Sequence, residues 1–177
     1  MTNYRRNFIP GGTYFFTLNL ADRGSKSLIE NIDVLREAFR YVRARHLFSV
    51  EAIVVLPDHL HTIWTLPDND FDYPVRWRLI KSAFSRALPS EEPVSASRAR
   101  KQERGIWQRR YWEHTVRDEA DYSRCVDYIH FNPVKHGHVK RVQEWPHSSF
   151  HAMVRSGVYP ADWAGDLAWT VSAFGER

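Results

Sequence analysis

The sequence contains little cysteine and no long apolar run, and each shortage excludes a class of protein. Cys125 is the only cysteine among 177 residues, which excludes an internal disulfide framework and any zinc cluster built from cysteines. The longest purely aliphatic stretch, 52–56, is far shorter than the roughly 20 residues of a membrane-spanning helix. The first twelve residues are polar and lack the apolar segment of a secretory signal. We therefore expect a cytoplasmic protein with no membrane contact.

The overall composition is that of a folded domain with a basic surface. Hydrophobic residues make up 43% and charged residues 26%, close to globular averages, so extensive disorder is not expected. Lysine and arginine number 25 against 21 acidic residues, which gives a formal net charge of +4. A basic balance of this kind is compatible with a nucleic-acid partner, but by itself it identifies none.

Hydrophobic periodicity divides most of the chain into strands and helices. Strands are predicted at 13–20, 49–56, 59–66 and 111–116, and helices at 31–45, 75–88 and from 118 to about 132. The first six elements follow the βαββαβ order of ferredoxin-like folds. We therefore expect an α+β fold in which helices cover one face of an antiparallel sheet. A C-terminal helix carrying Tyr128 and an irregular aromatic tail follow it.

The predicted domain organisation is a single domain with a tail. Residues 1–144 form the domain, and the aromatic-rich segment 145–177 is expected to pack on it rather than form a second core. Within the domain, 89–105 contains serines and charges but almost no large apolar residue, which predicts a mobile surface loop.

Two histidines in the third predicted strand form the first candidate site. His59 and His61 are two residues apart, so on a strand both imidazoles project from the same face. Two neutral imidazoles side by side can bind a divalent cation and leave positions open for a substrate oxygen. The alternative is a pair of hydrogen-bonded histidines without a ligand, and the tripeptide alone does not decide between them. Four other histidines are lesser candidate ligands: His114, His130, His136 and His138.

The last predicted helix carries the second candidate site. Tyr128 and Asn132 are one turn apart, at the margin of the apolar stripe that contains Val126 and Ile129. A half-buried tyrosine without a chemical role is the simpler explanation of this pattern. If the histidine face and the tyrosine face meet, however, a cation, a phenol and Asn132 share one site. A phenol has a pKa of about 10 in model peptides and needs such a cation to attack a phosphate.

These residues belong to a longer series of stretches that resembles a known family. His59-Leu60-His61 matches the His-hydrophobic-His signature of the single-tyrosine HUH transposases and nucleases. Six stretches are similar to one branch of that family, the REP-associated tyrosine transposases, where REP denotes repetitive extragenic palindromes. They occur in the family's order at 4–6, 11–17, 54–64, 107–114, 127–137 and 145–150. The resemblance runs from about Tyr4 to about Gly165.

The resemblance implies a function and a role for each matching residue. Tyr128 would be the nucleophile, forming a 5′-phosphotyrosine link to single-stranded DNA and freeing a 3′-hydroxyl. His59, His61 and Asn132 would bind the divalent cation, with Asn132 in a position where relatives often carry glutamine. The family ion is Mg²⁺ or Mn²⁺, although imidazole chemistry alone would favour zinc. The substrate would be a palindromic hairpin, and relatives in this branch are expected to act as monomers.

The basic residues are expected to contact DNA phosphates through their joint field. Those selected are Arg5, Arg6, Arg76, Arg78, Lys81, Arg109, Arg110, Lys135, Lys140 and Arg141. Two alternatives to an endonuclease and strand transferase stay open. One is a domesticated repeat-binding protein that no longer cleaves DNA, and the other is an unrelated zinc hydrolase that uses the histidines.

Overall fold

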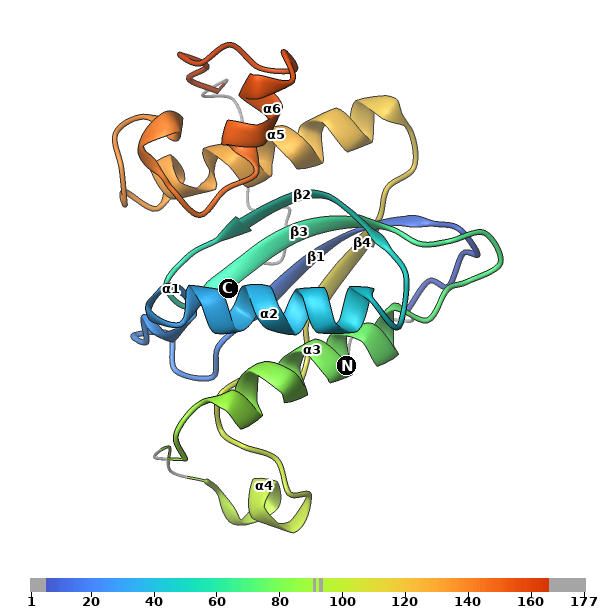
Figure 1. Cartoon of the computed structure of the whole chain (residues 1–177), viewed down its shortest axis with the longest axis vertical. Helices are drawn as coiled ribbons and strands as arrows, with labels where there is room; N and C mark the ends of the chain where they lie inside the picture. Colours follow the sequence, from blue (N-terminus) through green and yellow to red (C-terminus); the bar gives the residue numbers. More distant parts are fainter. Residues whose placement is uncertain (1–5, 91, 93, 166–177) are drawn as a thin grey trace, which may run out of the picture.

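The computed structural model describes residues 6–90, 92 and 94–165, and its centre is a four-stranded antiparallel sheet (Figure 1). The strands are β1 (Thr13–Asn19), β2 (Ser49–Val55), β3 (His59–Thr65) and β4 (Trp112–Thr115). They lie in the order β2-β3-β1-β4, and each neighbouring pair is antiparallel. This order is the one expected for a βαββαβ unit, so the predicted ferredoxin-like fold is confirmed.

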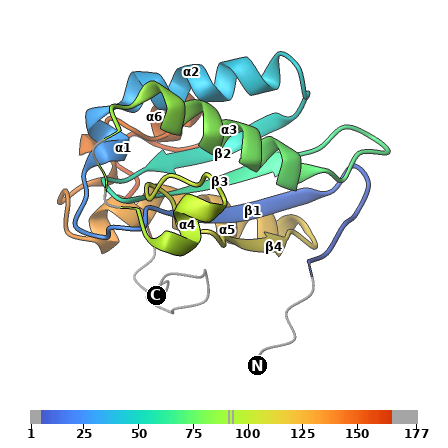
Figure 2. The same ribbon diagram turned by 90° about the horizontal axis from the view of Figure 1, so that it is seen from below.

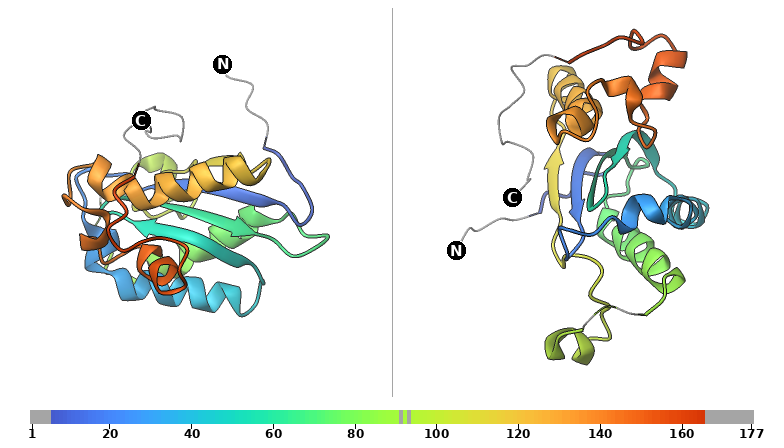
Figure 3. Two further views of the ribbon diagram at one scale, coloured as in Figure 1. Left: turned by 90° about the horizontal axis from the view of Figure 1, so that it is seen from above. Right: turned by 90° about the vertical axis from the view of Figure 1, so that its left-hand side faces the viewer.

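Helices cover both faces of this sheet. Helices α2 (Ile32–Arg43) and α3 (Tyr73–Ala87) lie side by side on one face, and α5 (Glu119–Lys135) lies on the other (Figures 1 and 3). The view from below in Figure 2 looks onto α2 and α3. Four shorter elements complete the described chain: α1 (Ser27–Glu30), α4 (Ala96–Arg100), the 3₁₀ helix η1 (Val142–Glu144) and α6 (Phe150–Arg155). The described helices include none that is long and apolar enough to cross a membrane.

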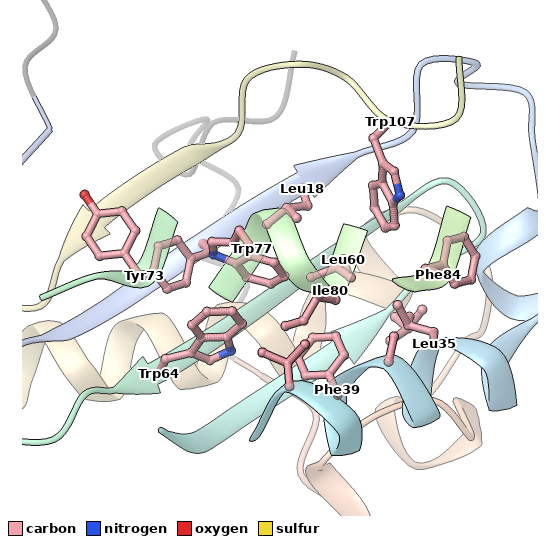
Figure 4. Close-up of a cluster of buried hydrophobic side chains, with 14 of the residues drawn as sticks. Leu18, Leu35, Phe39, Leu60, Trp64, Tyr73, Trp77, Ile80, Phe84 and Trp107 are labelled. Atoms are coloured by element: carbon pink, nitrogen blue, oxygen red, sulfur yellow. The ribbon is translucent and has the colours of Figure 1, made fainter. Parts of the chain in front are cut away.

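The larger of two cores lies between the sheet and the α2–α3 layer (Figure 4). Its centre is the stack of Trp64 from β3 on Trp77 from α3, whose ring centroids are 3.9 Å apart. Leu60 and Phe16 add buried apolar area around it. Each fully buried side chain of this size contributes roughly 1.5–3 kcal/mol, which makes this layer the main source of stability.

The second core lies between the sheet and α5, and it fixes the direction of the histidines. Ile63 of β3 belongs to this core, whereas Leu60 and Trp64 of the same strand belong to the other. Because side chains alternate along a strand, His59 and His61 share the face of Ile63 and point toward α5. The shared face predicted from the sequence is therefore confirmed.

Three details of the structure differ from the sequence-based expectations. Arg76, selected as a DNA contact, is only 3% exposed, because the fold brings Asp70 and the Leu47 carbonyl to its guanidinium. The segment 89–105 is not wholly a loop, since Ser95 caps the short helix α4. Helix α5 does not end at Pro133, because a proline in the last turn removes only one backbone donor.

The segment after α5 is more regular than the irregular tail that we expected. It contains η1 and α6, and its backbone follows the outer edge of β2. The Val55 N–H donates to His147 O at 2.9 Å, and the Ser149 N–H donates to Ile53 O at 2.8 Å. The prediction for Arg5, and the part of the predicted tail at 166–177, fall outside the described residues.

Candidate active site

The two histidines of β3 form a buried pair at the interface with α5. Their ring centroids are 5.1 Å apart, and the side chains are 1% and 0% exposed for His59 and His61. Buried imidazoles of this kind need a polar partner on each ring nitrogen or a ligand that replaces it. The contacts of the four nitrogens therefore decide what the pair can bind.

Nδ1 of His59 is held by a carboxylate. Asp58 Oδ1 lies 2.7 Å from this nitrogen, and Arg23 Nε lies 2.9 Å from the other oxygen of the same carboxylate. Burial alone would raise the pKa of Asp58, but the hydrogen bond and charge of His59 and the charge of Arg23 hold it below the ordinary value. The ionised carboxylate can only accept, so Nδ1 donates, and in the neutral imidazole Nε2 then carries the lone pair.

Nε2 of His59 is buried and has no hydrogen-bond partner among the described residues. Nδ1 of His61 lies 2.9 Å from the Thr17 hydroxyl on the neighbouring strand β1, where the two residues are direct cross-strand partners. A carboxylate or hydroxyl behind each imidazole is the usual arrangement behind metal-binding histidines. The donor set therefore fits a divalent cation held by the two Nε2 atoms.

Tyr128 approaches the histidine pair from α5 of the same chain. Asp118 caps this helix by accepting the Asp121 N–H, and the helix then packs against β2 and β3. The Tyr128 ring centroid lies 5.4 Å from that of His61. The structure therefore brings the predicted nucleophile and the predicted cation site together within one chain.

Asn132, the third predicted ligand, lies one turn after Tyr128 on α5 and is fully buried. Tyr128 itself is only 2% exposed. Both side chains were expected at the margin of the apolar stripe, and both lie inside the packed layer instead. A substrate phosphate can reach the Tyr128 hydroxyl oxygen only if part of the structure that covers it moves.

Two further residues at the C-terminal end of α5 complete the surroundings. Nζ of Lys135 lies 2.9 Å from the Tyr128 hydroxyl oxygen, although we had expected this lysine to contact DNA. The exposed ring of His136 lies 5.0 Å from that of His59, nearer than any other candidate histidine for which the described contacts give a distance. The helical spacing of 128, 132 and 135 was the signal that could have placed Lys135 in the site.

The remaining candidate histidines have other surroundings. The ring of His138 lies 6.2 Å from that of His136, and burial together with the charge of His136 lowers its pKa. His130 shares a hydrogen bond with the Ser149 hydroxyl at 3.0 Å, and burial lowers its pKa to about 4. It therefore stays neutral at physiological pH as a part of the α5–tail contact.

A second group of possible ligands joins β4 to α5. The ligand atoms of His114, Asp121 and Cys125 lie within 4.8 Å of one another. However, the Asp121 carboxylate already accepts hydrogen bonds from His114, the Arg117 N–H and Arg124. Burial, followed by the charge of Asp121, raises the pKa of the Cys125 thiol to about 12, so it stays protonated. This group fits a structural network better than a cation site.

Several of the predicted DNA-binding residues line a basic cleft beside α3, which belongs to the layer on the opposite face of the sheet from α5. The cleft measures about 710 Å³, and Trp77, Trp107 and Tyr111 form part of its wall. Seven cationic side chains line it: Arg6, Arg78, Lys81, Arg86, Arg98, Arg104 and Arg109. Arg86, Arg98 and Arg104 were not predicted. Arg86 lies on α3 with Arg78 and Lys81. For Arg98 and Arg104, nothing in the sequence shows that their segment folds back toward α3.

Lys81 is a half-buried cation of this cleft. Its ammonium donates to Gln108 O at 2.7 Å and lies 5.9 Å from the centre of the Trp107 ring. Burial, followed by the charge of Arg98, lowers its pKa to about 8. An anion bound here would relieve both effects.

The other predicted DNA contacts lie outside this group. Arg110 and Lys140 are exposed, and Arg141 forms an ion pair with Glu144 at 2.8 Å. Arg76 is occupied by Asp70 and backbone carbonyls, so we do not include it among the cations proposed for DNA.

The sequence and the fold match one family. The sequence model of the family described as "Transposase IS200 like" matches residues 22–132. The chain therefore belongs to the IS200-like tyrosine transposases, a family of DNA-cleaving enzymes that generally use a divalent metal.

Two sequence relatives and one solved structure are similar over nearly the whole chain. A REP-associated tyrosine transposase of Escherichia coli (strain K12) is 47% identical over 177 residues, which is 100% of this chain and 98% of the relative. A Haemophilus influenzae protein with the same family name is 46% identical over 167 residues, 94% of this chain and 95% of its own. A solved structure of a REP-associated tyrosine transposase bound to a REP hairpin has a TM-score of 0.88 and 47% identity, and covers 100% and 98% of the two chains.

Proposed function

We propose that this protein is a metal-dependent endonuclease and strand transferase for single-stranded DNA that carries palindromic hairpins. The observation that carries the proposal is the meeting of Tyr128 with the paired imidazoles of His59 and His61 within one chain. The relative bound to a REP hairpin supports the choice of substrate. Because one chain supplies both halves of the site, a monomer is sufficient for the chemistry.

In the proposed reaction the Tyr128 oxygen attacks the phosphorus of the scissile phosphodiester. A bond forms between the phenolic oxygen and phosphorus while the bond from phosphorus to the 3′-oxygen breaks. The phenol proton is lost to water, and the departing 3′-oxygen takes up a proton to become a free hydroxyl. The 5′-phosphotyrosine conserves the energy of the broken ester, so attack by a 3′-hydroxyl reseals the strand without ATP.

The residues of β3 and its neighbours hold the cation in this proposal. His59 and His61 are the ligands, Asn132 is the third, and Asp58 and Thr17 fix the two rings from behind. When bound, Mg²⁺ or Mn²⁺ would draw negative charge from the scissile phosphate. The basic cleft beside α3 and the exposed cations Arg110, Lys140 and Arg141 would bind the DNA backbone.

One observation favours a second candidate, a repeat-binding protein that no longer cleaves. Tyr128 is almost completely buried, so the bound DNA must first open the site. A protein that only recognises palindromes would not need to expose this oxygen.

The test is a covalent trapping experiment with an end-labelled single-stranded hairpin and either Mn²⁺ or Mg²⁺. A denaturing gel should show a protein–DNA adduct, and Tyr128→Phe should abolish it. The matched control is Tyr41→Phe, because Tyr41 is exposed on α2, far in the fold from the histidine pair. An adduct that survives Tyr128→Phe refutes the proposed nucleophile. Tight hairpin binding without adduct in any metal favours the second candidate.

A further inference from the structure

The hydroxyl of Tyr128 is in contact with a cation of its own helix. Lys135 Nζ lies 2.9 Å from the phenolic oxygen and 4.7 Å from the centre of the ring. The two distances place the ammonium at the hydroxyl end of the ring rather than above its face. Residues seven apart on an α-helix are separated by two turns and share one side, so α5 itself fixes this pair.

The chemistry of this contact is one-directional. A lysine ammonium has three donors and no acceptor, so Lys135 donates and the phenolic oxygen accepts. The rings of His61 and Phe15 pack against Tyr128 at 5.4 and 6.0 Å, and Tyr128 is 2% exposed. Electrostatic interactions are stronger where little water is present, so a positive charge here stabilises negative charge that develops on the phenolic oxygen.

We propose that Lys135 is a catalytic residue that stabilises the negative charge on the Tyr128 oxygen in both directions of the transfer. This inference rests on the proposed function. In cleavage, the oxygen loses its proton to water as its bond to phosphorus forms and the bond to the 3′-oxygen breaks. In resealing, a 3′-hydroxyl attacks, the bond from phosphorus to the tyrosine oxygen breaks, and Lys135 stabilises the departing phenolate.

The role is distinct from the phosphate contact that the sequence suggested for Lys135. A phosphate contact contributes to the affinity for DNA and to its salt dependence. A charge on the reacting oxygen contributes to the rate of the bound complex. The two roles therefore separate when affinity and single-turnover rate are measured on the same variant.

The first experiment measures both quantities for Lys135→Met, with a saturating hairpin substrate and Mn²⁺. We expect the rate of adduct formation to fall roughly 100-fold, as for the loss of one donor at a developing oxyanion. The hairpin Kd should stay within about threefold, because no phosphate contact is lost. Lys135→Arg should form adduct at least about tenfold faster than Lys135→Met, since it keeps a charged donor.

The control is Lys26→Met, which removes the same charge from an exposed position before α1 and should change neither quantity. Thermal unfolding of each variant shows whether the fold is retained. A Lys135→Met rate within about threefold of the parent overturns the inference. A weakened Kd that accounts for the whole defect also overturns it and assigns Lys135 to DNA binding.

A second experiment replaces Tyr128 with 2,3,5-trifluorotyrosine, whose phenolate forms more readily and needs less stabilisation. If Lys135 acts on the charge of this oxygen, the rate defect of Lys135→Met becomes smaller in the fluorinated protein. An equal defect in both backgrounds indicates a purely structural role and overturns the inference. If Tyr128→Phe still forms adduct, the proposed function itself fails, whatever Lys135→Met does, so the two failures are distinguishable.

Discussion

Asp58 Oδ1 lies 2.7 Å from Nδ1 of His59, and the opposite ring nitrogen, Nε2, is buried with no hydrogen-bond partner among the described residues. The same carboxylate is fixed by Arg23. Asp58, which lies in the turn between β2 and β3, therefore also supports a candidate metal ligand.

The first prediction follows from this support. Asp58→Asn should lower the affinity for Mn²⁺ by about 10- to 100-fold, because a neutral amide neither raises the basicity of His59 nor fixes its tautomer. Titration of the protein with Mn²⁺, followed by electron paramagnetic resonance, measures this affinity. Asp68→Asn, an exposed position beyond β3, is the matched control. Equal affinities in the two variants would contradict the arrangement.

The second prediction separates the two groups of possible metal ligands. Asp121→Asn should lower the free energy of unfolding by about 1–3 kcal/mol, because charged hydrogen bonds from His114 and Arg124 are lost. It should leave Mn²⁺ binding unchanged, whereas His59→Gln should remove it. Urea denaturation and the same Mn²⁺ titration measure the two effects. Loss of Mn²⁺ binding in Asp121→Asn would move the cation site to β4 and α5.

The third prediction concerns pH and the basic cleft. The pKa of Lys81 is lowered to about 8 by burial and by Arg98, so its ammonium is charged at pH 7 and neutral at pH 9. Hairpin binding should therefore weaken as the pH rises through 8. The slope of log K against log salt should become shallower by about one between pH 7 and pH 9.

Fluorescence anisotropy with a labelled hairpin at several salt concentrations measures this slope. Lys81→Arg should keep the slope of pH 7 at both pH values, because the guanidinium stays charged. A parent protein whose slope is the same at pH 7 and pH 9 would place the hairpin away from this cleft.

Local pattern was sufficient to predict the sheet, the shared face of His59 and His61, and the helix of Tyr128. These features depend on spacings of two and about 3.6 residues, which the sequence displays directly. Burial of Arg76 was not predictable, because the Leu47 carbonyl reaches its guanidinium only through the packing of α3 on α2. Periodicity states which side chains share a face and leaves open which face is buried.

In the candidate site, too, some features were predictable from local spacing and others were set by the tertiary fold. Tyr128 and Asn132 were recognisable on one stripe of a helix, but the Thr17 contact with His61 depends on the register between β1 and β3. The convergence of Tyr128 with the histidines depends on α5 returning to the sheet within the same chain. Distances between side chains on different helices and strands are set by the tertiary fold, and the spacing of residues in the sequence does not predict them.

The hydrogen bonds of His147 and Ser149 to β2 limit how the sheet can grow. β2 is an outer strand, and its free backbone groups would otherwise be a template for pairing with another chain. The segment that follows η1 occupies those of Ile53 and Val55 instead. A second copy could therefore pair with this part of β2 only by first displacing that segment.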